Sequence, residues 1–164
     1  MRSWLMLLLI CLTPASLTLS SPAHADMTLP GVIRMSTPLD VDTAYQRLYQ
    51  ALEGERFWVV FETDMGSRME KMRERWGADY NRQQLIGVRS MVFCNIDWTH
   101  RIANADPQLL ALCPLHLSVY GQNGSTTVVM PRPSVLAAGS AGIDEASALE
   151  AELTGIIQRA LSKH

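Results

Sequence analysis

The sequence lacks most of the short motifs by which enzyme classes are recognised. It holds only 3 cysteines among 164 residues, and no two of them form the Cys-x-x-Cys motif of thiol oxidoreductases and haem attachment. It also lacks a Gly-x-Ser-x-Gly elbow, a glycine-rich phosphate loop and a His-Glu-x-x-His zinc helix. The sequence therefore identifies no catalytic residue, no cofactor and no metal ligand set.

An excess of charge of one sign is also missing. The chain has 14 Lys and Arg against 16 Asp and Glu, whereas a general nucleic-acid binder shows a basic surplus on one face. We therefore expect no nucleic-acid partner. Beyond the N-terminus the chain has no apolar run approaching the ~20 residues that span a bilayer, so we expect no membrane span in the remainder.

The N-terminus has the pattern of an export signal. Arg2 provides a positive start, residues 4–12 form an uninterrupted apolar core, and Ala23-His24-Ala25 has the form that signal peptidases cleave. We expect cleavage after Ala25 and a periplasmic or secreted protein. A membrane anchor is the alternative, but the apolar run is roughly half of the length that a span needs.

Residues 26–164 are predicted to form one domain of the α+β class. Runs rich in β-branched and aromatic residues predict strands, and apolar residues at three- and four-residue spacing predict helices. The predicted strands cover residues 31–37, 56–62, 85–95, 115–120 and 125–130, and the predicted helices cover residues 41–54, 65–76, 98–104 and 144–162. The order β-α-β-α-β-α-β-β-α favours a single, mainly antiparallel sheet covered by helices.

The helix predicted over residues 65–76 carries Met65, Met69, Met72 and Trp76 on one face. A methionine stripe in an exported protein suggests copper, because thioether sulfur is a soft ligand for Cu(I). The same spacing is that of a buried helical seam, and methionine fills irregular gaps in cores. We interpret the stripe as part of the hydrophobic core.

Cys94 closes one predicted strand and Cys113 comes just before the next. If these strands are antiparallel neighbours, both cysteines lie at the same end of the sheet. A disulfide needs Cα atoms within about 7 Å, and an exported protein meets the oxidising conditions in which disulfides persist. The alternatives are a structural bridge and a reactive or metal-binding thiol, and the sequence leaves both open.

A short helix between the cysteines carries polar and aromatic side chains. We expect Asp97 to cap this helix, and we take Asn95, Trp98 and His100 as the candidate ligand-binding residues. His116 alternates with leucines, so it should face away from the core. The spacing of the two cysteines and two histidines matches no common zinc motif.

Several of these segments resemble the bacterial family known as domain of unknown function 302. The similar segments are residues 91–95, 104–107 and 113–120, and the likeness extends over residues 36–162. This chain differs in having Ile96 where the family often has proline, and in its longer, more charged helix over residues 65–76. The resemblance implies a compact α+β fold with an antiparallel sheet, often paired into dimers, and no established activity.

We therefore expect an exported accessory module without catalytic activity that binds a small ligand or a partner protein through Asn95, Trp98 and His100. The alternative is that Cys94 and Cys113 handle thiols, disulfides or a metal such as copper or haem iron. The two hypotheses differ in the oxidation state and metal content that they predict for the two sulfurs.

Overall fold

The computed structural model describes residues 29–162, so the predicted signal peptide over residues 1–25 lies outside the described residues. The strands are β1 (Val32–Thr37), β2 (Trp58–Asp64), β3 (Ile86–Cys94), β4 (Leu115–Gln122) and β5 (Ser125–Pro131). The helices are α1 (Val41–Gly54), α2 (Met65–Glu70), α3 (Arg73–Trp76), α4 (Ile96–Ala105), α5 (Pro133–Leu136) and α6 (Ile143–Leu161), with 3-10 turns η1 (Gly77–Asp79) and η2 (Pro107–Leu112).

The five strands form one sheet in the order β1-β5-β4-β3-β2. Every neighbouring pair in this order is antiparallel. The sheet and its helices make up one α+β domain, which confirms the fold class predicted from the sequence. None of the helices within residues 29–162 has the length and apolar character needed to cross a bilayer.

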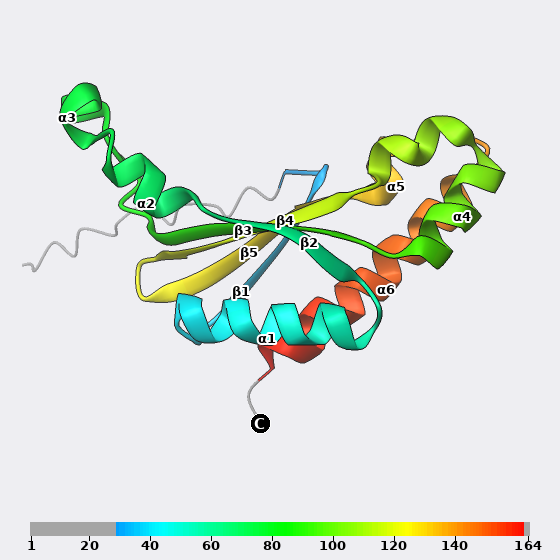
Figure 1. The fold of residues 1–164 in the computed structure, drawn as a ribbon, viewed down its shortest axis with the longest axis horizontal. Helices are drawn as coiled ribbons and strands as arrows, with labels where there is room; N and C mark the ends of the chain where they lie inside the picture. Colours follow the sequence, from blue (N-terminus) through cyan, green and yellow to red (C-terminus); the bar gives the residue numbers. More distant parts are fainter. Residues whose placement is uncertain (1–28, 163–164) are drawn as a thin grey trace, which may run out of the picture.

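Helices α1 and α6 lie together against one face of the sheet (Figure 1). The core forms between them and the side chains that the strands point toward them. Its fully buried large members include Leu48 and Leu52 of α1, Leu149, Leu153, Ile156 and Ile157 of α6, and Met91, Phe93, Leu117 and Met130 of the sheet. Phe57, just before β2, packs edge-on against Phe93 with ring centroids 6.1 Å apart.

Local sequence signals set the ends of several elements as expected. The side chain of Asp40 accepts a hydrogen bond from the Thr43 N–H at 2.9 Å and so caps α1. Asn123 and Gly124 have φ angles of 52° and 75° in the turn between β4 and β5. Asn-Gly tolerates such angles, and the predicted hairpin is confirmed.

The other face of the sheet carries an aromatic strip, which we define as Trp58 and Phe61 of β2. Trp58 lies opposite Cys94 on β3, and Phe61 lies opposite Val92. Cys94 and Val92 are two residues apart, so they point to the same face, away from the buried Phe93. Trp58 and Phe61 are 50% and 56% exposed, and the strip therefore lies on the surface next to Cys94.

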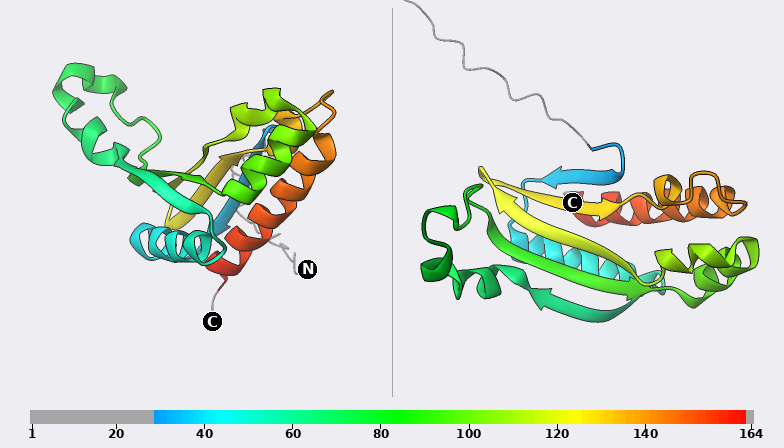
Figure 2. Two further views of the ribbon diagram at one scale, coloured as in Figure 1. Left: turned by 45° about the vertical axis from the view of Figure 1, so that its right-hand side comes forward. Right: turned by 90° about the horizontal axis from the view of Figure 1, so that it is seen from above.

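The segment between β2 and β3 corrects one prediction. Residues 65–85 project from the end of the sheet as an arm, with α2 and α3 as separate short helices (Figures 1 and 2). No residue of either helix is buried, so the stripe of Met65, Met69, Met72 and Trp76 is not a core seam. An amphipathic face is buried only where a second layer covers it, and the arm extends beyond the helix layer.

The connections after β3 and β5 also hold more helix than the sequence predicts. The turn expected at residues 106–107 continues into η2, and the loop expected over residues 134–142 begins with α5. In both segments a proline occupies the first turn, where its fixed φ angle and missing N–H are tolerated. Together α4, η2 and α5 extend the molecule beyond the end of β3 (Figure 2).

Candidate functional site

The two cysteines lie on either side of one hydroxyl group. The Sγ of Cys94 and the Sγ of Cys113 are each 3.3 Å from Thr99 Oγ1. Both cysteines are half-buried and carry free thiols. We call Cys94, Cys113 and the Thr99 hydroxyl the thiol site.

The fold brings the two sulfurs together through the pairing of β3 with β4. These strands are antiparallel, and Phe93 lies opposite Leu115 at the end where β3 finishes and β4 begins. Cys94 is the last residue of β3, and Cys113 comes two residues before β4. The chain between them runs out through α4 and returns through η2, and these two helical segments contact each other. The expected meeting of Cys94 and Cys113 at one end of the sheet is therefore what the structure shows.

Thr99 reaches the sulfurs because it lies in the first turns of α4. Its hydroxyl is 2.9 Å from the carbonyl oxygen of Asn95, to which it donates, as well as 3.3 Å from Cys113 Sγ. A hydroxyl carries one proton, so these two acceptors share it. Thr99 thus connects the start of α4 directly to the thiol site.

The environment of the thiol site keeps Cys113 protonated. Burial raises the pKa of the Cys113 thiol above 9.0, and the neighbouring Cys94 adds to the rise, while the hydrogen bond from Thr99 opposes it. The nucleophilic form of cysteine is the thiolate. Burial at this end of the sheet therefore favours the neutral thiol of Cys113 over its thiolate.

The three side chains predicted to bind a ligand do not surround one cavity. Asn95 is buried and caps α4: its Oδ1 accepts from the N–H groups of Asp97 and Trp98 at 2.9 and 3.2 Å. The predicted cap, Asp97, instead lies inside the first turn and pairs with Arg56 at 3.1 Å. Asn95 therefore has a structural role that the sequence prediction assigned to Asp97.

Trp98 and His100 point to different surroundings. The Trp98 indole is buried, donates to Glu152 Oε2 at 3.2 Å, and has the Arg101 guanidinium 3.8 Å from its ring centroid. His100 is exposed and bonds Asn104 at 3.2 Å. Trp98 thus joins α4 to α6, and His100 lies on the outer surface of α4. His116 is exposed, as predicted.

Sequence reasoning missed two residues that complete these contacts. Thr99 lies between the cysteines in the sequence, but only the placement of α4 brings its hydroxyl to both sulfurs. A threonine five residues after a cysteine that ends a strand is a weak signal. Glu152 is far from Trp98 along the chain, and no local pattern predicts their hydrogen bond.

The profile of the family described as "Domain of unknown function DUF302" matches residues 33–160. The chain belongs to the DUF302 family. It is also similar to the crystal structure of an uncharacterised conserved DUF302 protein from Bacillus stearothermophilus. That comparison has a TM-score of 0.67 and 22% sequence identity, and covers 80% of this chain and 99% of the other. At this identity the likeness shows a shared fold. No curated protein matches the chain.

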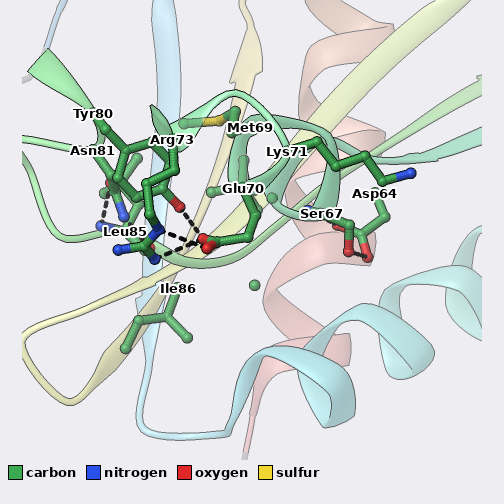
Figure 3. Close-up of a pocket in the computed structure, with 13 residues that line it drawn as sticks. Asp64, Ser67, Met69, Glu70, Lys71, Arg73, Tyr80, Asn81, Leu85 and Ile86 are labelled. Atoms are coloured by element: carbon green, nitrogen blue, oxygen red, sulfur yellow. Dashed lines mark hydrogen bonds and ion pairs between the residues drawn. The ribbon is translucent and has the colours of Figure 1, made fainter. Parts of the chain in front are cut away.

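This DUF302 domain has a cavity of about 550 Å³ between its arm and the start of β3. Figure 3 shows Glu70 in its wall, where the carboxylate accepts hydrogen bonds from Arg73 Nε at 2.6 Å and from the Tyr80 hydroxyl at 2.5 Å. The Arg73 hydrogen bond first, and the Tyr80 hydrogen bond second, lower the pKa of Glu70 to about 2. The carboxylate is thus already occupied by groups of the arm itself.

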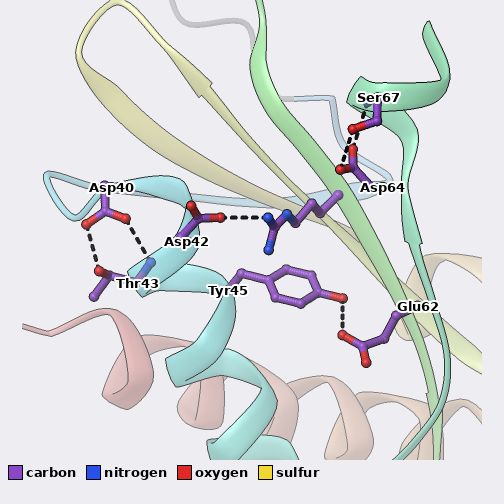
Figure 4. A network of polar contacts seen from close by, with 8 residues as sticks. Asp40, Asp42, Thr43, Tyr45, Glu62, Asp64 and Ser67 are labelled. Carbon is purple, nitrogen blue, oxygen red and sulfur yellow. Dashed lines mark hydrogen bonds and ion pairs between the residues drawn. The ribbon is translucent and has the colours of Figure 1, made fainter. Parts of the chain in front are cut away.

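A second polar network ties α1 of the DUF302 domain to the sheet. Tyr45 donates to Glu62 Oε2 at 2.7 Å, and the Arg89 guanidinium pairs with Asp42 at 2.9 Å while lying 5.4 Å from the centroid of the Tyr45 ring (Figure 4). Burial first, and the hydrogen bond to Glu62 second, raise the pKa of Tyr45 well above 10.0. We interpret this network as structural, because it joins α1 to two strands.

Proposed function

We propose that the protein is an exported thiol–disulfide module in which Cys94 and Cys113 alternate between two thiols and one disulfide. The observation that carries the proposal is the 3.3 Å distance from each sulfur to the same Thr99 hydroxyl. The export signal expected over residues 1–25 supports it, because disulfides form and persist in oxidising compartments. The proposal gives a role to the only two cysteines of the described residues.

The chemistry is an exchange with an external disulfide. The Cys94 thiolate attacks one sulfur of that disulfide, forms a mixed disulfide with it, and releases the other sulfur as a thiolate. Cys113 then loses its proton and attacks Cys94 Sγ, which forms the Cys94–Cys113 bond and releases the second external thiolate. The protein pair loses two electrons and two protons, and the external disulfide is reduced to two thiols.

Oxidation should also change stability. A bridge between Cys94 and Cys113 closes a loop of roughly 19 residues, which in the chain-entropy model stabilises a fold by ~3 kcal/mol. The oxidised form should therefore unfold at a higher urea concentration than the reduced form. Strain in the bridged state would reduce this difference.

The experiment is a redox titration of the purified protein with mixtures of reduced and oxidised glutathione. Each sample is quenched with a thiol-alkylating reagent and its intact mass is measured. We expect one cooperative transition between a form with two alkylated cysteines and a form with none. Cys113→Ser should stop at a mixed disulfide with glutathione. Two thiols that stay alkylatable at every glutathione ratio would remove the proposal.

The aromatic strip favours a second function, the binding of a partner protein, through Trp58 and Phe61 and not through the Asn95, Trp98 and His100 expected from the sequence. Trp58 lies opposite Cys94 in the β2–β3 pairing and is half exposed. Because the strip is continuous with the thiol site, the partner that it fits is the protein that supplies the exchanging disulfide. Aromatic side chains on such surfaces often carry much of the binding energy.

Paired rate measurements separate this binding role from the exchange chemistry. Trp58→Ala and Phe61→Ala should slow exchange with a disulfide held in a folded protein, and should leave exchange with oxidised glutathione unchanged. Trp76→Ala is the matched control, since Trp76 is exposed on the arm. Equal slowing with both substrates, or slowing by Trp76→Ala as well, would argue against a docking role for the strip.

A further inference from the structure

The reduced thiol site presents two sulfur atoms to one small region. Both lie 3.3 Å from Thr99 Oγ1, on a half-buried surface where α4 leaves the sheet. Thiolate sulfur is a soft donor that selects soft metal ions, Cu(I) among them. We propose that reduced Cys94 and Cys113 together bind one copper(I) ion, with the two sulfurs as its only protein ligands.

The donor set decides which kind of metal fits. Over residues 29–162 no group of three or more His, Cys, Asp or Glu side chains converges to hold an ion. Structural zinc takes four such ligands, whereas copper(I) is stable between two thiolates. The pair therefore offers what a two-coordinate, monovalent soft ion needs.

Neither nearby histidine belongs to this donor set. His100 turns toward Asn104 on the outer side of α4. His116 is exposed on β4, opposite Val92 and not opposite Cys94. His116 therefore serves as the test of whether the site has two ligands or more.

Binding is balanced by the loss of two protons. Cys94 and Cys113 each exchange a thiol proton for a bond to copper(I), and the ion with its two thiolates carries one negative charge. The Thr99 hydroxyl is placed to donate to the Cys113 sulfur and to hold part of that charge. The N-terminus of the ten-residue helix α4, which begins just after Asn95, favours negative charge nearby. No oxidant or reductant takes part in this step.

This inference deepens the proposed function, since it names a ligand for the reduced form of the same pair. The two ideas fail separately. A protein that forms the Cys94–Cys113 disulfide but binds no copper(I) would keep the proposed function and lose this inference. A protein that binds copper(I) but never forms the bridge would keep this inference and lose the proposed function.

The test is an anaerobic titration of the fully reduced protein with copper(I) in competition with a chromogenic copper(I) chelator. Native mass spectrometry of the product gives the stoichiometry. We expect one copper per chain, with a gain in neutral mass of one copper atom less one hydrogen, because the charge of copper(I) offsets one of the two lost protons. Silver(I), which has no accessible redox step under these conditions, should bind with the same stoichiometry. A protein with no stoichiometric copper(I) or silver(I) would overturn the inference.

Four variants assign the ligands. Cys94→Ser and Cys113→Ser should each lose stoichiometric binding, because one sulfur alone cannot compete with the chelator. Thr99→Val keeps the shape of Thr99 and should weaken affinity about tenfold, the usual effect of removing a group that hydrogen-bonds a ligand. His116→Ala should bind as the unmodified protein does. Full binding by either serine variant, or a loss of affinity in His116→Ala, would contradict a site built from two sulfurs.

Discussion

The Tyr45 hydroxyl donates a hydrogen bond to Glu62 Oε2 at 2.7 Å, which joins α1 to the edge strand β2. Tyr45 is only 3% exposed, and its burial raises the pKa of the hydroxyl far above 10.0, helped by Glu62. A tyrosine whose pKa is raised by folding contributes fully to stability below the unfolded pKa of about 10. That contribution falls as the pH rises from there toward the folded value.

The first prediction follows from the raised pKa of Tyr45 in the folded protein. Tyr45→Phe should lower the free energy of unfolding by about 1 kcal/mol at neutral pH, the usual net value of one hydrogen bond. It should also remove part of the loss of stability above pH 10. Urea unfolding from pH 7 to 11 measures both effects. Tyr120→Phe, on the other face of the sheet, is the matched control, and an equal change in its alkaline profile would argue against the assignment to Tyr45.

The second prediction separates the core from the arm. Met91→Ala should destabilise the protein by about 2–5 kcal/mol, because the side chain is fully buried in the core. Met69→Ala should change the free energy of unfolding by less than about 1 kcal/mol, since no residue of α2 is buried. Chemical denaturation of the two variants compares them directly. Equal losses would mean that the methionine stripe is core after all.

The third prediction concerns the start of α4. Asn95→Ala should lower the free energy of unfolding by about 1–2 kcal/mol, because the side chain caps two backbone N–H groups. Asn95→Asp keeps an acceptor oxygen and should restore most of the loss. Asp97→Ala should lower the free energy of unfolding by less than about 1 kcal/mol, because the ion pair of Asp97 with Arg56 is exposed. A larger loss for Asp97→Ala than for Asn95→Ala in thermal unfolding would reverse this assignment.

The fourth prediction is a stabilising substitution. Gly155 lies inside α6, and a Cβ added there would meet only the end of the Arg159 side chain, at 3.2 Å. That side chain is flexible and can move aside. Gly155→Ala should therefore raise the free energy of unfolding by up to about 1 kcal/mol, the difference in helix propensity. A drop in the urea midpoint would show that another part of the fold needs the glycine.

Much of the fold is predictable because its signals are local. Asp40 followed by apolar residues at helical spacing predicts α1, and Asn123-Gly124 predicts the hairpin. The sequence predicted the meeting of Cys94 and Cys113 only if their strands were antiparallel neighbours, and β3 and β4 are such neighbours. These predictions depend on nearby residues or on the simplest strand pairing.

The failed predictions depend on tertiary placement. Asn95 and Asp97 are both good helix caps, and only the path of the chain after β3 decides between them. The stripe of Met69 and its neighbours has the period of a buried face, but the arm has nothing to bury it against. Thr99 becomes part of the thiol site because the start of α4 places its hydroxyl 3.3 Å from both sulfurs at the end of β3, which no pattern in the sequence specifies.

The central claim is that Cys94 and Cys113 act as one site, and a bridging reagent tests it most directly. A trivalent aryl arsenical binds tightly only where two thiols can reach the same arsenic atom. Reduced protein treated with one equivalent should gain a single arsenical in its intact mass and lose both alkylatable thiols, whereas Cys94→Ser and Cys113→Ser should keep the remaining thiol alkylatable. Two thiols that stay alkylatable in the treated protein would show that the sulfurs do not share a site, and would contradict the account.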